Sequence, residues 1–175
     1  MNVHHPDIEE FIDCKTQEGA IHNFNISVGA TDAFMKAVKN NEEFEMIDPT
    51  SKKVVGKKNA KKLFNKIVKG AWKNGEPGII FLDEVNRKSP VSHLGEMTAT
   101  NPCGEQPLLP NESCNLGSIN LSKFLNDSNT EVDWSKLRKT TRTATHFLDN
   151  TIDANKYAIP EIKKANKLSR KIGLG

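Results

Sequence analysis

The sequence contains few cysteines, few arginines and few aromatic residues. Its three cysteines are too few, and odd in number, for the disulfide framework of a small secreted protein. Arginine supplies only four of the 25 cations, and aromatic residues make up 6% of the chain. A dedicated nucleic-acid-binding protein usually has more of both, for phosphate contacts and for base stacking. We therefore expect neither a secreted disulfide-rich protein nor a nucleic-acid partner.

Long apolar segments are also missing. The longest uninterrupted apolar run is four residues, 79–82, whereas a membrane-spanning helix needs about 20. The first ten residues have neither the basic nor the apolar part of a secretory signal. With 36% hydrophobic and 27% charged residues and a net charge of +3, the composition is that of a globular protein. We expect no membrane partner and a cytoplasmic location.

Five segments have apolar residues at helical spacing. The predicted helices begin near residues 7, 32, 60, 134 and 160, where prolines or capping side chains favour a helix start. The third predicted helix has Val68 and Trp72 on its apolar stripe, and the fifth extends to Ile172. Seven lysines between residues 57 and 73 lie mainly opposite the third helix's stripe. We interpret them as a solvated face, with a phosphate-binding face as the alternative.

Strand patterns alternate with these helices. Residues 24–28 alternate in polarity, and residues 44–47 and 53–55 flank a turn signal, which predicts a hairpin. The apolar residues 79–82 predict a buried strand.

Residues 89–118 have neither helical nor strand periodicity. They include four of the eight prolines, and no lysine or arginine occurs from residue 89 to residue 122. A disordered linker in this lysine-rich chain would be charged, and long loops inside domains are usually functional. We therefore expect this segment to pass through the protein interior.

A short motif inside this segment combines an amide, a thiol and a carboxylate. Pro102 and Gly104 flank Cys103, which predicts that the thiol lies at the tip of a stiff bend. Asn101 and Glu105 alternate with Cys103, so in extended backbone the three side chains would project the same way. A carboxylate can act as a general base and a thiol as a nucleophile or redox centre. A tight turn with a buried, unreactive cysteine is the alternative interpretation.

The second cysteine in the segment, Cys114, is consistent by itself with a buried core position. The spacing between Cys103 and Cys114 matches no zinc-binding pattern. We therefore expect no metal site.

The motif NPCGEQPL, continued by ESCNLGSINL, closely resembles the active-site segment of ribonucleotide reductases. The likeness is strongest to the adenosylcobalamin-dependent (class II) large chain. It extends to the segments HPDIEEF, NFNISV, PGIIFLD and RKIGLG, which cover most of the chain. The resemblance implies a ten-stranded α/β barrel, of which residues 1–175 are a central, incomplete portion. It also implies that residues of about 89–118 form a finger loop at the centre of the barrel.

The resemblance implies a role for each residue of the motif. Cys103 resembles the cysteine that becomes a thiyl radical and abstracts the ribose 3′ hydrogen. Glu105 resembles the base that takes the 3′-hydroxyl proton, and Asn101 the amide that hydrogen-bonds the substrate hydroxyls. Pro102 and Gly104 complete the substrate-binding loop. Cys114 resembles one half of the redox pair that is oxidised to a disulfide.

The resemblance also implies partners. These are adenosylcobalamin, a ribonucleoside di- or triphosphate substrate, a thioredoxin-like reductant and complementary reductase segments. The family's partner for the cysteine that Cys114 matches lies before the HPDIEEF segment, and Cys14 does not match it. We therefore expect the chain alone to be inactive. A class I reductase fragment, with a metal-derived radical, and a non-catalytic remnant that binds nucleotide or partner chains are the alternatives.

Overall fold

The computed structural model describes residues 1–16, 21, 23–128 and 130–175, and it divides into two compact units. The first unit is Met1–Leu108 and the second is Leu109–Gly175. Among the described residues, no helix is long and apolar enough to cross a membrane. The strands form four separate two-stranded sheets, β1–β4, β2–β3, β5–β6 and β7–β8. The described chain is thus a mixed α/β structure without a closed barrel.

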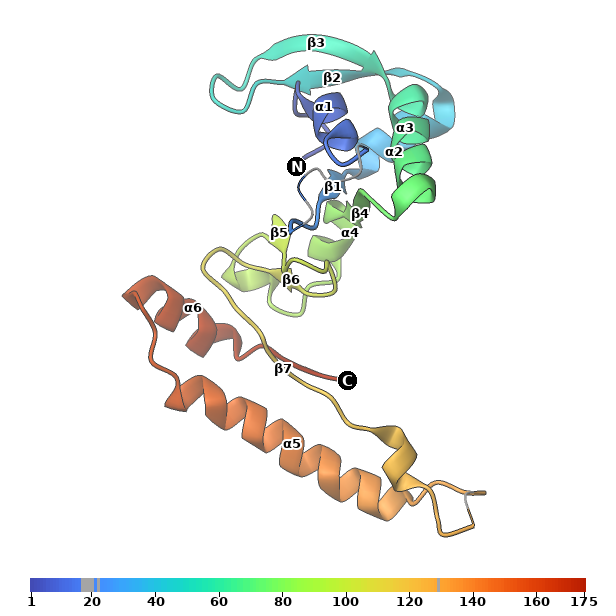
Figure 1. The fold of residues 1–175 in the computed structure, drawn as a ribbon. Coiled ribbons are helices and arrows are strands. Elements are labelled where there is room, and N and C mark those ends of the chain that lie inside the picture. The colour runs from blue at the N-terminus through green and yellow to red at the C-terminus, as the bar shows by residue number, and fades with distance from the viewer. Residues whose placement is uncertain (17–20, 22, 129) are drawn as a thin grey trace. The chain divides into compact units, whose positions relative to one another are not determined.

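The first unit begins with helices and strands that alternate along the chain (Figure 1). Its elements are α1 (Ile8–Asp13), β1 (Ser27–Ala30), α2 (Asp32–Asn40), β2 (Glu43–Ile47), β3 (Val54–Asn59), α3 (Ala60–Asn74), β4 (Gly78–Phe81), α4 (Leu82–Arg87), η1 (Ser92–Leu94), β5 (Ala99–Thr100) and β6 (Pro107–Leu108). Strands β1 and β4 are parallel, with Ser27 opposite Gly78 and Ala30 opposite Phe81. Strands β2 and β3 form the predicted antiparallel hairpin.

One hydrophobic core holds this unit together. Phe34 of α2 is fully buried and contacts Phe44 of β2 edge to face, with ring centroids 5.0 Å apart. The core also includes residues of the chain start, α1, β1, α2, β2 and α3: Val3, Ile8, Ile12, Val28, Ala30, Ala37, Met46, Ala60, Leu63 and Ile67. Val28 and Ala30 of β1 belong to this core. The core therefore fixes the strand that borders the candidate site.

The second unit is built on the longest helix of the described chain. Its elements are β7 (Asn115–Gly117), η2 (Leu121–Phe124), α5 (Trp134–Ala154), α6 (Pro160–Ser169) and β8 (Ile172–Leu174). Asp133 caps α5 by accepting a hydrogen bond from the Lys136 amide at 2.9 Å, and Pro160 is the first residue of α6. Strands β7 and β8 are parallel, and both contact α5. Cys114 directly precedes β7, so helix α5 and the β7–β8 sheet position the segment that carries it.

The structure confirms the five predicted helices and the hairpin, and it corrects several details. Residues 24–28 were expected to be a strand, but β1 begins only at Ser27. Strand β4 is half-buried to exposed rather than buried, and Leu82 starts α4, which the apolar run did not predict. On α3, Val68 is 48% and Trp72 is 87% exposed, because Ala60, Leu63 and Ile67 fill the core side of that helix.

The last predicted helix is also too long. Helix α6 ends at Ser169, and Ile172 lies in β8 because that segment pairs with β7 instead of continuing the helix. The lysines of α3 lie at the surface as predicted, and one lysine of β3 and one of α3 pair with acids of α1. Lys58 is 3.0 Å from Glu9 and Lys66 is 2.6 Å from Asp13. These pairs support the interpretation as a solvated face.

Candidate active site

Residues 101–106 form the loop of a short β-hairpin. Strands β5 and β6 are antiparallel, with Thr100 opposite Pro107. The Asn101 amide donates to the Gln106 carbonyl at 3.1 Å and closes the loop. Cys103 lies in the middle of this loop and is exposed. The prediction that the thiol stands at the tip of a bend is therefore confirmed.

The loop is stabilised from within by Asn101 and Gly104. The Gly104 amide donates to the Asn101 carbonyl at 3.0 Å, and the Gln106 amide donates to Asn101 Oδ1 at 3.0 Å. Gly104 has a φ of +83°, the left-handed region that a side chain disfavours. The backbone therefore turns here, so the expectation of extended backbone is wrong.

The turn nevertheless brings two of the three side chains together. Asn101 Nδ2 donates a hydrogen bond to Glu105 Oε1. This contact leaves the carboxylate with its second oxygen and its remaining lone pairs for another donor. An amide and a carboxylate thus act as one hydrogen-bonded unit in the same loop as the exposed thiol.

The sulfur of Cys103 receives a hydrogen bond from a residue far away in the sequence. Asn25 Nδ2 lies 3.8 Å from Cys103 Sγ and donates to it. Asn25 comes just before β1, whose start is tied to β4 by the hydrogen bond from the Gly78 amide to the Ile26 carbonyl at 2.9 Å. Sequence reasoning did not assign Asn25 to the site, because 78 positions separate the two residues and no local pattern connects them.

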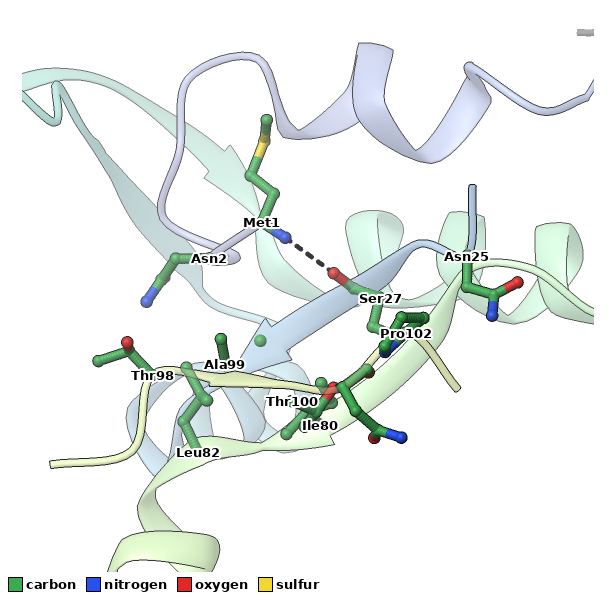
Figure 2. A pocket seen from close by; sticks show the side chains of 12 residues that line it. Met1, Asn2, Asn25, Ser27, Ile80, Leu82, Thr98, Ala99, Thr100 and Pro102 are labelled. Atoms are coloured by element: carbon green, nitrogen blue, oxygen red, sulfur yellow. Dashed lines mark hydrogen bonds between the residues drawn. The ribbon is translucent and has the colours of Figure 1, made fainter. Parts of the chain in front are cut away.

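A pocket of about 340 Å³ lies beside this loop, within the first unit. Figure 2 shows the side chains around it, which come from the chain start, β1, β4 and β5. Its lining includes Asn25, Thr98, Asn101 and Pro102. The volume is within the range of small-molecule sites in proteins, and amide and hydroxyl groups on its wall can hydrogen-bond a polar ligand.

The amino group of Met1 also lies at this pocket. It donates to the Ser27 carbonyl at 2.8 Å, the dashed line in Figure 2. Burial lowers the pKa of this amino group from its ordinary value, because the charged form loses hydration. The wall of the pocket around β1 is therefore held by main-chain contacts.

Cys114 belongs to the second unit, in the segment before β7. It is half-buried, and its Sγ donates to the Asn115 carbonyl at 3.6 Å. Two residues earlier, the side chain of Glu112 is completely buried. Glu112 Oε2 accepts a hydrogen bond from the Leu109 amide at 2.7 Å and is 2.6 Å from Lys171 Nζ. A buried ion pair therefore holds the segment that carries Cys114.

A second polar contact holds the same segment. Asn166 of α6 accepts hydrogen bonds from the Ser113 amide at 3.1 Å and from the Ser113 hydroxyl at 2.6 Å. Asn166 is 4% exposed and donates in turn to the Ile162 carbonyl. Neither this contact nor the ion pair was predicted, because their partners are more than 50 residues away. The position of Cys114 thus depends on α6 and on the segment that leads into β8.

Arg170, which precedes Lys171 in the sequence, forms ion pairs with two acids of α5. Its guanidinium donates to Asp149 at 2.8 and 2.9 Å and to Asp153 at 2.9 and 3.3 Å. These hydrogen bonds lower the pKa of both carboxyl groups and raise the pKa of the arginine. The connection between α6 and β8 is therefore anchored to α5 by charge.

Most of the segment 89–118 is at the surface of the described chain. Its buried residues are Met97, Leu109 and Glu112. The expectation that the segment is enclosed is therefore wrong for this chain by itself, since four separate strand pairs do not form a wall around it. The described residues also contain no group of three or more His, Cys, Asp or Glu placed to bind a metal ion.

Comparison with known protein families adds a decisive observation. The family model for the ribonucleotide reductase barrel domain matches residues 1–175. The chain belongs to this family. Its hairpin loop with Asn101, Cys103 and Glu105 is therefore the loop of a reductase barrel domain, and the resemblance of the sequence to ribonucleotide reductases is confirmed.

Several curated proteins are similar to this reductase segment over its whole length. The vitamin B12-dependent ribonucleoside-diphosphate reductase of Thermoplasma acidophilum is 51% identical over 176 residues, covering 100% of this chain and 23% of that protein. The protein of the same name from Mycobacterium tuberculosis is 47% identical, and the match covers 25% of it. Over a shorter stretch, the subunit alpha of Chlamydia pneumoniae ribonucleoside-diphosphate reductase is 37% identical over 139 residues, covering 77% of this chain and 13% of that protein. The chain thus spans about a quarter of the length of the first two relatives.

Proposed function

We propose that this chain is the part of a vitamin B12-dependent ribonucleotide reductase that carries the radical cysteine, and that it works together with complementary segments of the enzyme. The observation that supports this most directly is the hairpin loop 101–106, which presents an exposed thiol beside a hydrogen-bonded amide–carboxylate pair. The substrate would be a ribonucleoside di- or triphosphate. The product would be the 2′-deoxyribonucleotide for DNA synthesis.

Cys103 is the residue that starts the proposed reaction. When bound, adenosylcobalamin supplies the radical chemistry that removes the hydrogen atom of a thiol. The chemistry of the loop fits this cofactor, because Cys103 is exposed and carries the S–H bond that would be broken. Its sulfur radical would then take the hydrogen atom from C3′ of the ribose.

Asn101 and Glu105 would manage the protons of the sugar. Glu105 would accept the 3′-hydroxyl proton, which makes loss of water from C2′ easier. Asn101 Nδ2 already donates to Glu105 Oε1, so the amide can keep the carboxylate oriented while the other oxygen receives the proton. Asn101, Pro102 and Gly104 would hold the sugar hydroxyls against the loop.

Cys114 would provide one half of the reducing power. Replacement of C2′–OH by C2′–H releases one water and consumes the two hydrogens and two electrons of two thiols, which become a disulfide. The second thiol would come from a complementary segment, and a thioredoxin-like protein would reduce the disulfide. Because the reaction uses thiols, we infer a reducing compartment, the cytoplasm. The ten-stranded barrel would be completed by the same complementary segments, with residues 89–118 as its finger loop.

The test is a reductase assay on this chain assembled with the complementary segments of a vitamin B12-dependent relative. We expect deoxyribonucleotide formation that requires adenosylcobalamin and that Cys103→Ser abolishes. Cys14→Ser is the matched control and should retain activity, since Cys14 lies at the end of α1 away from the loop's hydrogen bonds. Turnover by Cys103→Ser would refute the assignment. Turnover without adenosylcobalamin would favour the class I alternative, and an assembly that binds nucleotide without turnover would favour the non-catalytic one.

A further inference from the structure

We propose that Asn25 is a positioning residue for the radical chemistry, acting through its hydrogen bond to the sulfur of Cys103. This inference rests on the proposed function of Cys103. Neither the motif nor the names of the relatives give Asn25 a role. The observation that carries it is the donor–acceptor distance of 3.8 Å between Asn25 Nδ2 and Cys103 Sγ.

The backbone next to Asn25 is rigidly held. Ile26 and Val28 are buried, and β1 pairs with β4 along its length. On its other side, β1 is hydrogen-bonded to the chain start through Gly29. The Val3 amide donates to the Gly29 carbonyl at 2.9 Å, and the Gly29 amide donates to the Met1 carbonyl at 2.8 Å. Asn25 lies two residues before this hydrogen-bonded strand, whereas Cys103 lies on an exposed loop. The hydrogen bond from Asn25 therefore anchors the Cys103 side chain to the backbone next to β1.

The hydrogen bonds inside the loop do not reach the sulfur. They join Asn101 with Gly104, Glu105 and Gln106. These contacts set the backbone of the loop, but rotation about χ1 of Cys103 can still move the sulfur atom. The hydrogen bond from Asn25 selects among these rotamers.

The chemistry of the contact suits a residue that orients a thiol. A sulfur atom is a weak hydrogen-bond acceptor, and an amide N–H is a donor only. When Asn25 donates to the sulfur, the S–H hydrogen must point away from the amide. The same donor would keep the sulfur in place after the hydrogen is lost, since the acceptor lone pair remains.

The pocket places this contact at the edge of a ligand site. Asn25 lines the pocket of about 340 Å³ together with Asn101 and Pro102 of the loop. Figure 2 shows Asn25 and Pro102 towards the start of β1, and Thr98 and Leu82 towards its end. Asn25 therefore lies where it can fix the sulfur relative to a sugar bound in the pocket.

Two measurements on the same variants test the inference. The first is the rate at which iodoacetamide alkylates Cys103 in this chain, resolved from Cys14 and Cys114 by peptide mass spectrometry. The second is kcat and KM for deoxyribonucleotide formation in the assembled enzyme. The variants are Asn25→Leu, which removes the donor, Asn25→Asp, which replaces it with a negative acceptor, and Asn25→Gln, which keeps an amide. Asn40→Leu is the matched control, because Asn40 is also an exposed asparagine whose amide donates a hydrogen bond, at 3.1 Å to Glu42 Oε1, and it does not line the pocket.

We expect Asn25→Leu to slow alkylation of Cys103 about threefold, because the thiolate loses a hydrogen-bond donor, and to lower kcat about three- to tenfold with KM unchanged. Asn25→Asp should have a lower alkylation rate at Cys103 and a lower kcat than Asn25→Leu. Asn25→Gln should recover part of both losses. Asn40→Leu should match the wild-type chain. Asn25 is exposed, so these variants should fold.

Three results would overturn the inference. Unchanged alkylation in Asn25→Leu would show that the contact does not act on the sulfur, and faster alkylation would show that Asn25 only restrains the loop. A rise in KM with unchanged kcat would make Asn25 a substrate-binding residue instead. Turnover by Cys103→Ser would refute the proposed function separately, and the alkylation rates would still decide whether Asn25 controls the thiol.

Discussion

The buried ion pair between Glu112 and Lys171 gives the sharpest prediction about stability. The Glu112 side chain is 0% exposed and that of Lys171 is 13% exposed, and the charged atoms are 2.6 Å apart. Glu112 Oε1 is buried and has no hydrogen-bond partner in the described part of the chain. The carboxylate therefore depends on Lys171 and on the Leu109 amide to compensate for its lost hydration.

Replacement of Lys171 by Met removes the cation and keeps most of the aliphatic chain. It leaves the buried carboxylate without the cation that pairs with it, a change that typically costs about 3–5 kcal/mol. We expect Lys171→Met to lower the free energy of unfolding of the second unit by about 3 kcal/mol. Adding Glu112→Gln should recover part of this loss, because the neutral amide can still accept from the Leu109 amide.

The assay is urea unfolding followed by circular dichroism, with hydrogen exchange of the β7 and β8 amides to assign the change to the second unit. The matched control is Lys167→Met. Lys167 is 3.4 Å from Asp153, but these side chains are 43% and 54% exposed, so the loss should stay below about 1 kcal/mol. If Lys171→Met cost no more than Lys167→Met, the buried pair would not stabilise the segment that carries Cys114.

Two other predictions concern charge and backbone conformation. Arg170 lowers the pKa of Asp149 and Asp153, so their contribution to stability is full above their ordinary pKa of 3.8 and is lost as the pH falls through the lowered values. The urea midpoint of the second unit should therefore decrease as the pH is lowered below about 4, and Arg170→Met should flatten this dependence; an equally steep decrease in the variant would contradict the reasoning. Gly104→Ala should destabilise the hairpin loop by about 1 kcal/mol, because φ is +83° although a Cβ would meet nothing within 4 Å. Hydrogen exchange of the Gln106 amide should become about fivefold faster, while Gly75→Ala, with a φ of +85° at the end of α3, should leave that amide unchanged; equal exchange in both variants would refute the argument.

Local sequence signals predicted the helices well. Thr31 accepts a hydrogen bond from the Phe34 amide at 3.2 Å, Asp133 caps α5, and Pro160 starts α6. In each case the signal and the element it controls lie within four residues, so the sequence contains the complete interaction. The hairpin β2–β3 was predictable for the same reason.

Elements that depend on distant partners were missed or misplaced. Ile172 has the spacing to extend α6, but it pairs with Asn115 of β7, 57 positions earlier. At the candidate site, Pro102 and Gly104 predicted the bend, whereas the Asn25 contact and the Glu112–Lys171 pair had no local signal. Periodicity describes one element, and these contacts are between elements.

The absence of lysine and arginine from residues 89–122 remains to be explained, since most of these residues are exposed in the described chain. A freely hydrated surface in a chain with 25 cations would be expected to carry some of them. Leu116 and Leu121 in this region are 60% and 65% exposed, and apolar side chains of this size gain free energy when they are covered. Both observations are accounted for if the residues are buried by complementary segments, as the proposed function requires. The lack of lysine and arginine would then reflect the burial of residues 89–122 in the assembled barrel. The exposed fractions describe the 175-residue chain by itself.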